Sequence, residues 1–269
     1  MAPQADRGGI VSLVTTKIEG PVGLITINRP EALNMFDLPL IDALQRGLAN
    51  FEQDPDARVI VVTGAGERAF AAGADIADLN ARRSLAHYLE FADVVHRAFR
   101  RFEACEKPTI SAINGLAVGG GLELVLATDI RIAAEQAKLG LPEIALGLFP
   151  GGGGSQRLMR QISPCRAREM MFTGDSISAA SALELGLVNR VVSRERVLPE
   201  AMELALRIAG KSLLALKLLK RTLNHGADMP LPAALAYEQA MVSLAFDSSD
   251  AHEGCDAFLA KRTPTFRDR

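Results

Sequence analysis

The 269-residue sequence is short of the residues on which several protein classes depend. It has no tryptophan and only two tyrosines, Tyr88 and Tyr237. Its three cysteines, Cys105, Cys165 and Cys255, are far apart and odd in number, which argues against a disulfide framework and against a cysteine-based zinc site. The formal net charge of −2 lacks the basic footprint that nucleic-acid-binding proteins usually show. We therefore expect no nucleic-acid partner.

Long apolar runs and targeting signals are also lacking. No apolar segment reaches the roughly 20 residues that a membrane-spanning helix needs. Met1–Gly20 contains Asp6 and has neither the basic region nor the apolar core of a secretory signal. With 48% hydrophobic and 23% charged residues, the composition is that of a globular protein large enough to bury a sizeable core. We expect a cytoplasmic protein that does not span a membrane.

What the sequence does contain is an alternation of strand and helix patterns up to about residue 195. β-branched or apolar segments predict strands at 22–28, 58–63, 109–113, 129–133 and 187–192. The spacing of apolar residues predicts helices from Asp37 to about Gln53, from Ser84 to about Phe102, and at 155–162. Strands interleaved with helices predict an α/β domain over residues 1–195.

After Val197 the spacing is helical only. Leu213–Leu223 has leucines around much of its circumference, which predicts burial between neighbouring elements. Further helices are expected at 233–246 and after Ser248. The sequence therefore predicts a C-terminal helical subdomain over residues 196–269.

The stretch 114–143 is the most suggestive chemically. Gly119–Gly121 follows an apolar strand and opens a short helix with Glu123 in its first turn, and Glu143 comes after a further strand and a Gly-Leu-Pro bend. Glycine lets a ligand approach backbone N–H groups, which are unpaired at a helix start. Two alternatives stay open at this point: the glycines could serve only a turn, and both glutamates could be acids favoured by a helix dipole.

Other chemistries find little support in the residues. The glycine runs at 119–121 and 151–154 match neither a phosphate-binding loop nor a dinucleotide fingerprint nor a nucleophile elbow. The four histidines (His87, His96, His225 and His252) show no metal-ligand spacing, and we interpret them as structural or surface residues. No metal site is predicted.

Several segments together resemble the signatures of the enoyl-CoA hydratase/isomerase (crotonase) family, in the family's order and spacing. The resemblance covers about Val22 to the C-terminus. The matching segments are Arg68–Ile76, Asn114–Leu124, Leu141–Ile144, Pro150–Leu158, Phe172–Asp175, Ala182–Val188 and Phe258–Phe266. The resemblance implies an α/β fold, a crotonase-like (ClpP/crotonase) spiral of β-β-α units with a C-terminal helical subdomain. It also implies a homotrimer or a homohexamer that is a dimer of trimers.

The resemblance assigns roles to residues of the glycine-rich segments. Backbone N–H groups of Ala74 and Gly120 would form an oxyanion hole for a thioester enolate. Glu123 and Glu143 would share one water molecule, with Glu143 donating a proton to C2 and Glu123 activating the water. Gly151 N–H would help to hold that water. The implied reaction is reversible hydration of trans-2-enoyl-CoA to 3-hydroxyacyl-CoA, a lyase step of fatty acid β-oxidation, with no metal or redox cofactor; CoA arrives as part of the substrate.

The CoA contacts are also implied by the resemblance. They would come from the loop at 72–77, from a leucine near the nucleotide, and from basic residues that often belong to a neighbouring protomer: Ala72, Ala74, Asp75, Ile76, Ala77, Gly120, Leu33, Lys261 and Arg262. Several family members carry a lysine where this chain has Ala77. Arg68 or Lys261 would then have to supply the missing phosphate contact.

The family hosts more than one reaction, so alternatives remain. Enoyl-CoA isomerisation or a carnitinyl-CoA-type dehydration could use the same donors and acids. A remote alternative is an RNA-binding or scaffold member, which the net charge disfavours. With only Tyr88 and Tyr237 available, a phenol-dependent aromatic lyase has less support. Chain-length preference would depend on the pocket wall, expected from the helix after Ser84 and the segment after Gly151.

Overall fold

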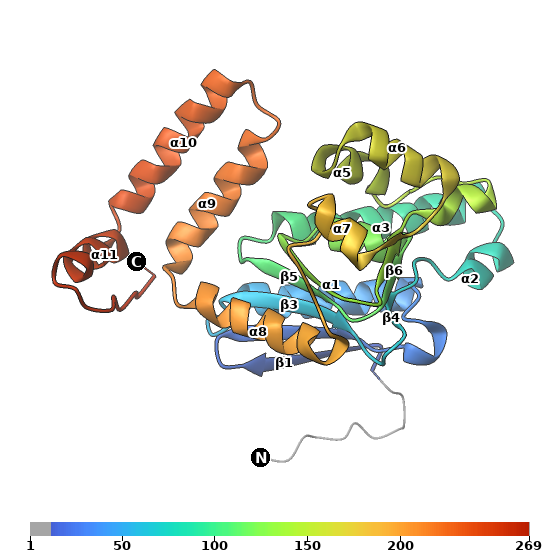
Figure 1. Cartoon of the computed structure of the whole chain (residues 1–269), viewed down its shortest axis with the longest axis horizontal. Coiled ribbons are helices and arrows are strands. Elements are labelled where there is room, and N and C mark those ends of the chain that lie inside the picture. The colour runs from blue at the N-terminus through green and yellow to red at the C-terminus, as the bar shows by residue number, and fades with distance from the viewer. Residues whose placement is uncertain (1–11, 269) are drawn as a thin grey trace, which may run out of the picture.

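The larger of two β-sheets forms the centre of the molecule. The structure, a computed structural model, describes residues 12–268 (Figure 1). The expectation of a signal-free N-terminus falls partly on residues 1–11, which lie outside the described residues. The six strands of the larger sheet run in the order β1 (Val14–Glu19), β2 (Val22–Ile27), β3 (Val59–Gly64), β5 (Thr109–Ile113), β7 (Ile130–Ala134) and β10 (Arg190–Val192). The β1–β2 pair is antiparallel, and the other neighbours are parallel.

A second sheet of short strands lies beside the first. Its order is β4 (Ala69–Ala71), β6 (Leu116–Val118), β8 (Lys138–Gly140) and β9 (Ile177–Ser178), with only the last pair antiparallel. In the successive pairs β3–β4, β5–β6 and β7–β8, the first strand joins the larger sheet and the second joins the smaller one. The chain thus winds as a spiral of β-β-α units. The sequence missed these short strands, because segments of two or three residues show no periodicity. It also missed the six-residue strand β1.

Helices cover both faces of the larger sheet. Figure 1 shows α8 (Arg194–Ala209) in front of the sheet and α1 (Leu38–Gln53) behind it. The N-cap role predicted for Asp37 is confirmed: its Oδ1 accepts a hydrogen bond from Leu40 N at 2.9 Å. The predicted helix after Ser84 is confirmed as α3 (Leu85–Ala104), which packs against α1. The remaining helices of this part are α2 (Ile76–Ala81), α4 (Gly120–Leu126), α5 (Gly154–Gln161), α6 (Pro164–Thr173) and α7 (Ala179–Glu184), with 3₁₀ turns η1 (Pro30–Ala32) and η2 (Pro142–Leu146).

The last three helices lie to one side of the two sheets. They are α9 (Leu213–Gly226), α10 (Leu231–Phe246) and α11 (Ser249–Leu259), which Figure 1 shows to one side of the body. The predicted burial of the α9 leucines is wrong for the single chain, because Leu219 and Leu223 are 54% and 62% exposed. The cause is spatial: α9 packs along α10, and its buried residues are only Leu213 and Lys220.

The C-terminal helices are attached to the body by a buried charge. Lys220 Nζ donates to Asp129 Oδ2 at 2.7 Å and to the Lys107 carbonyl at 3.2 Å. The sequence assigned α8 to the helical subdomain, whereas the structure packs Val197 and Ala201 of α8 into the core of the sheet layer. The boundary at residue 195 stays a prediction. Within residues 12–268, no helix combines the length and apolarity that crossing a bilayer requires.

Candidate active site

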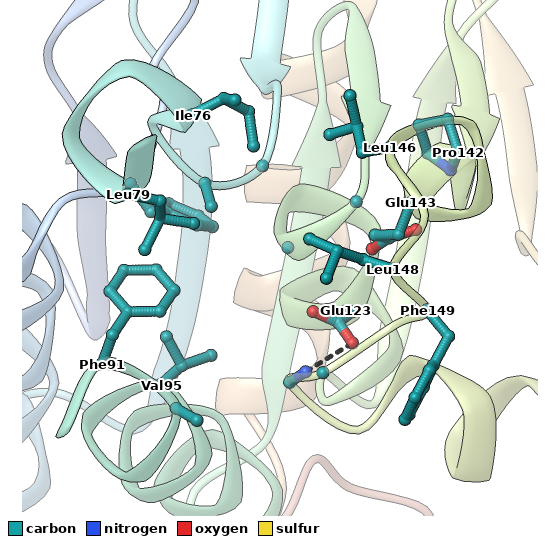
Figure 2. A pocket seen from close by; sticks show the side chains of 18 of the residues that line it. Ile76, Leu79, Phe91, Val95, Glu123, Pro142, Glu143, Leu146, Leu148 and Phe149 are labelled. Carbon is teal, nitrogen blue, oxygen red and sulfur yellow. Dashed lines mark hydrogen bonds between the residues drawn. The ribbon is translucent and has the colours of Figure 1, made fainter. Parts of the chain in front are cut away.

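A cavity of about 220 Å³ opens where the β4 and β6 strands end. Its walls come from the turn after β4, from α2 and α3, from the start of α4, and from residues 142–152 (Figure 2). In Figure 2 the carboxyl groups of Glu123 and Glu143 lie on one side, and Leu79, Phe91 and Val95 lie on the other. The cavity therefore places two acids opposite an apolar wall.

Two backbone N–H groups at the cavity have no partner within the described chain. Ala74 and Gly120 both line the cavity, and neither N–H has an acceptor among residues 12–268. Ala74 and Gly120 each follow a glycine with a positive φ angle: Gly73 has φ +86° and Gly119 has φ +54°. A Cβ on Gly73 would lie 3.2 Å from Gly120 N, so the two turns are in close contact. These glycines bring the two predicted donors together, although Ala74 and Gly120 are far apart in sequence.

Two side-chain amides, that of the buried Asn34 and that of the partly buried Asn114, hold the loop that carries Ala74. Asn34 Nδ2 donates to the carbonyls of Ala65 and Ala69 at 3.1 and 2.9 Å. Asn114 Nδ2 donates to the carbonyls of Gly64 and Gly66 at 2.9 and 2.8 Å. Because a fully satisfied amide allows one backbone arrangement, these contacts fix the backbone that leads to Ala74. Sequence reasoning did not assign this role to either asparagine.

Glu123 is held rigidly in the cavity wall. It lies in the first turn of α4, and only 3% of its surface is exposed. Its Oε1 accepts hydrogen bonds from Gly152 N at 2.7 Å and Gly154 N at 2.8 Å. Burial raises the pKa of Glu123, while these two N–H groups and the cation of Arg157 act in the opposite direction. The side chain is thus an oriented hydrogen-bond acceptor.

Glu143 differs from Glu123 in its hydrogen bonds. It follows Pro142 in the first turn of η2, which agrees with the N-terminal position considered from the sequence. Within the described residues its Oε2 is buried and has no hydrogen-bond partner. Burial raises its pKa to about 7, and the nearby charge of Glu123 adds to the rise. A carboxyl group with this pKa can hold a proton near neutral pH and release it during a reaction.

The two carboxyl groups and the two free N–H donors face one cavity, so the arrangement can stabilise an oxyanion and move protons beside it. Gly151, predicted to help hold a water, also lines the cavity. A Cβ on Gly151 would lie 2.7 Å from the Tyr88 hydroxyl, which shows how closely Tyr88 approaches this segment.

Part of the apolar wall was missed from the sequence. The long helix after Ser84 was expected to contribute and does so through Tyr88, Phe91 and Val95. Leu146, Leu148 and Phe149 also line the cavity, although the sequence pointed to the segment after Gly151 and not before it. The available signal was the spacing of Phe91 and Val95 on one helix face, but that spacing equally describes core residues.

The predicted CoA-binding residues fall into two groups. Ala72, Ala74, Ile76 and Gly120 line the cavity. Leu33, Arg68, Asp75, Ala77 and Lys261 are absent from its lining. Their role in binding CoA stays a prediction.

Several residues of the second group have structural contacts. Asp75 caps α2 through Ala77 N at 3.1 Å and pairs with Arg29 Nη2 at 3.0 Å. Leu33, with φ +53°, accepts a hydrogen bond from Ala72 N at 3.0 Å through its carbonyl. Asp75 and Leu33 therefore shape the loop beside the cavity from outside it.

Residues 12–268 contain no group of three or more His, Cys, Asp or Glu side chains arranged to hold a metal ion. The expectation that no metal or redox cofactor takes part stays a prediction.

The β-β-α spiral, with carboxyl groups facing paired backbone donors, defines a crotonase-like protein. The family model described as enoyl-CoA hydratase/isomerase matches residues 17–269. The chain belongs to the enoyl-CoA hydratase/isomerase (crotonase) family, as its motifs predicted. The crystal structure of an enoyl-CoA hydratase from Bacillus anthracis superimposes with a TM-score of 0.93 at 37% identity, covering 96% of this chain and 100% of that one.

Two relatives show how the family's substrates vary at similar identity. The chain is 40% identical over 248 residues to a crotonyl-CoA hydratase of Syntrophomonas wolfei, covering 92% of this chain and 95% of the relative. It is 41% identical over 246 residues to a 2,3-dehydroadipyl-CoA hydratase of Escherichia coli, covering 91% and 95%. The acyl groups named for these two proteins differ in charge, so identity alone does not select a substrate.

Proposed function

We propose that the protein is an enoyl-CoA hydratase, which adds water reversibly to trans-2-enoyl-CoA to give 3-hydroxyacyl-CoA. The single observation that carries this proposal is the presence of both Glu123 and Glu143 in the cavity that holds the free N–H groups of Ala74 and Gly120. Isomerisation needs only one group to move a proton between carbons, whereas addition of water benefits from a base and an acid together.

The proposed steps follow from the two carboxyl environments. The thioester oxygen accepts hydrogen bonds from Ala74 N and Gly120 N, which stabilise the negative charge that develops on it. Glu123, ionised, accepts a proton from a water molecule whose oxygen bonds to C3. Glu143, protonated, delivers its proton to C2. Glu123 ends protonated and Glu143 ionised, so the proton passes from Glu123 to Glu143, directly or through solvent, before the next turnover.

The test is a comparison of Glu143→Gln and Glu123→Gln with the wild type on crotonyl-CoA, followed by loss of the conjugated enoyl absorbance. Each variant should lose at least about 100-fold in kcat, the scale on which a positioned acid or base contributes. Hydration by Glu143→Gln at a near wild-type rate would reject the assignment. Turnover of a 3-enoyl-CoA to the 2-enoyl isomer, without hydration of either, would identify an isomerase.

The proposal includes assembly into a homotrimer or a hexamer of paired trimers. Large apolar side chains on α9 and α10 are exposed in the single chain, and α10 buries none of its residues. An apolar surface of this kind is typical of a subunit interface. Assembly could also bring Lys261 of a neighbouring copy near bound CoA. Light scattering of the purified protein should show three or six chains per particle; a monomer would contradict the proposal.

A further inference from the structure

Arg157 contacts the backbone of the glycine loop, residues 151–154, through the Gly152 carbonyl. It belongs to α5, and its side chain is 10% exposed. Its Nη1 donates to the Gly152 carbonyl at 3.0 Å. Its Nε and Nη2 donate to the two carboxylate oxygens of Glu103, on α3, at 3.2 and 2.9 Å. This two-point contact fixes the plane of the guanidinium group, as such pairs do.

The glycines of the loop are required by this packing. Gly153 has φ +104°, and a Cβ there would lie 2.2 Å from Arg157 Nη1. A Cβ on Gly152 would lie 2.5 Å from Glu123 Oε2, and one on Gly154 would lie 2.9 Å from Glu123 Cγ. The backbone is therefore pressed between a guanidinium group on one side and a carboxylate on the other.

The contacts of the loop divide along its backbone. The N–H groups of Gly152 and Gly154 donate to Glu123, and the intervening Gly152 carbonyl accepts from Arg157. A rotation of the peptide plane between Gly152 and Gly153 would break the arginine contact and shift the donors to Glu123. Glycine offers little resistance to such a rotation by itself, because it has no side chain that restricts φ and ψ.

We propose that Arg157, held by Glu103, is a positioning residue that keeps the glycine loop in the conformation that orients the Glu123 carboxylate. This inference rests on the proposed hydratase function. Arg157 does not line the cavity, so it acts through the loop and not on the substrate. Glu103 is about half exposed and serves to fix the arginine.

The inference has a consequence for pH dependence. Among the described residues, the charged or titratable groups near Glu123 are Glu143 of η2 and Tyr88 of α3, which line the same cavity, and Arg157 of α5, whose charge acts on Glu123. Arg157 is the only cation among them and lowers the pKa of Glu123. Without this cation and with the N–H donors displaced, Glu123 should protonate at higher pH. The acid limb of the rate profile, where the base is lost, should then move toward neutral pH.

The experiment compares Arg157→Gln, Arg157→Lys and Glu103→Gln, with Arg160→Gln as the control. Arg160 lies on the same helix, is exposed, and contacts Gln156 and Asp228. Arg157→Gln should lower kcat on crotonyl-CoA about 100-fold while KM changes little, because a misplaced group costs on this scale. Arg157→Lys should recover part of kcat, Glu103→Gln should lose less, and Arg160→Gln should match the wild type.

A second measurement does not depend on turnover. The ¹³C titration of the Glu123 carboxyl, recorded in a Glu143→Gln background to remove coupling, should move to higher pH in Arg157→Gln and stay unchanged in Arg160→Gln. An unchanged titration, or a kcat loss without a shift of the acid limb, would overturn the inference. If Arg157→Gln does not fold, Arg157→Lys and Glu103→Gln decide by the same two criteria. Failure of the wild type to hydrate any enoyl-CoA would reject the proposed function instead.

Discussion

Glu123 and Glu143 line the same cavity, yet their surroundings differ in almost every respect. Glu123 sits in a regular helix, accepts two N–H hydrogen bonds and lies near a cation. Glu143 sits in a short 3₁₀ turn, and its buried Oε2 has no partner in the described chain. The two glutamates are therefore held in different ways: Glu123 is a fixed hydrogen-bond acceptor, although burial raises its pKa, and Glu143 is a carboxyl group with a pKa of about 7.

Substitution of the glycines near the two carboxylates should give the largest difference between the two sites. Gly152→Ala would place a Cβ 2.5 Å from Glu123 Oε2, whereas a Cβ on Gly147, next to η2, meets nothing within 4 Å. Gly152→Ala should therefore lower kcat about 1,000-fold, within the range of a displaced acid or base. Gly147→Ala should retain activity and lose only about 1 kcal/mol of stability, because Gly147 has φ +73°.

Steady-state kinetics on crotonyl-CoA and urea unfolding measure both variants. Equal losses of activity in Gly152→Ala and Gly147→Ala would contradict the difference between the surroundings of Glu123 and Glu143.

The apolar wall opposite the two carboxyl groups should produce the next largest effect, a preference for uncharged acyl groups. Within residues 12–268, no lysine, arginine or histidine lines the cavity. An unpaired carboxylate buried there would cost several kcal/mol. With trans-2-hexenoyl-CoA and 2,3-dehydroadipyl-CoA, which have equal chain length, we expect kcat/KM to be at least about 100-fold higher for the uncharged acyl group, equivalent to ~2.7 kcal/mol.

Comparable kcat/KM values for these two thioesters would mean that the acyl end leaves the cavity. The adjoining surface near Arg82 and Arg83 would then be the place to look for its carboxylate partner.

The pH profile should separate the two carboxyl groups. In the proposed hydration Glu143 acts protonated, so kcat/KM should fall as the pH rises through its pKa of about 7. Glu123 acts ionised in the same proposal, so the rate should fall as the pH drops and Glu123 takes up a proton. Because the groups interact, the two limbs describe the pair. The profile of kcat/KM between pH 4 and 9 checks this, and a flat response above pH 7 would argue against Glu143 as the acid.

The smallest expected effect is on the stability of Glu143→Gln relative to the wild type. The folded-state pKa of Glu143 is raised, so its ionisation opposes folding; this cost is absent below its unfolded pKa, near 4.5, and complete above about 7. Glu143→Gln should therefore be more stable than the wild type at pH 8 by about 1–2 kcal/mol, reduced from ~3.4 kcal/mol because the group is partly exposed. At pH 4 the difference should vanish.

Thermal unfolding at the two pH values checks this prediction, with Glu90→Gln on the exposed face of α3 as the control. A Glu143→Gln variant that is less stable than the wild type at pH 8 would show that the ionised carboxylate is satisfied in the folded chain.

Much of the fold was accessible from the sequence. The strand at 109–113 and the helix capped by Asp37 were predicted with nearly the observed bounds, because hydrophobic spacing and a capping side chain are local signals. The exposure of α9 and α10 in the single chain was not predicted. Their leucine pattern indicates that these faces are covered, but it does not indicate which element covers them. The short strands of the second sheet were missed because their pairing partners lie in distant units.

The candidate site divides in the same way. The sequence by itself determined the family and the identity of the glutamates and glycines, since these are properties of motif and spacing. Only the tertiary structure decided that Gly152 and Gly154 hold Glu123 while Glu143 Oε2 stays without a partner. The physical reason is that a pKa depends on burial, nearby charge and hydrogen-bond partners, and these arise only when distant segments of the chain pack around one cavity.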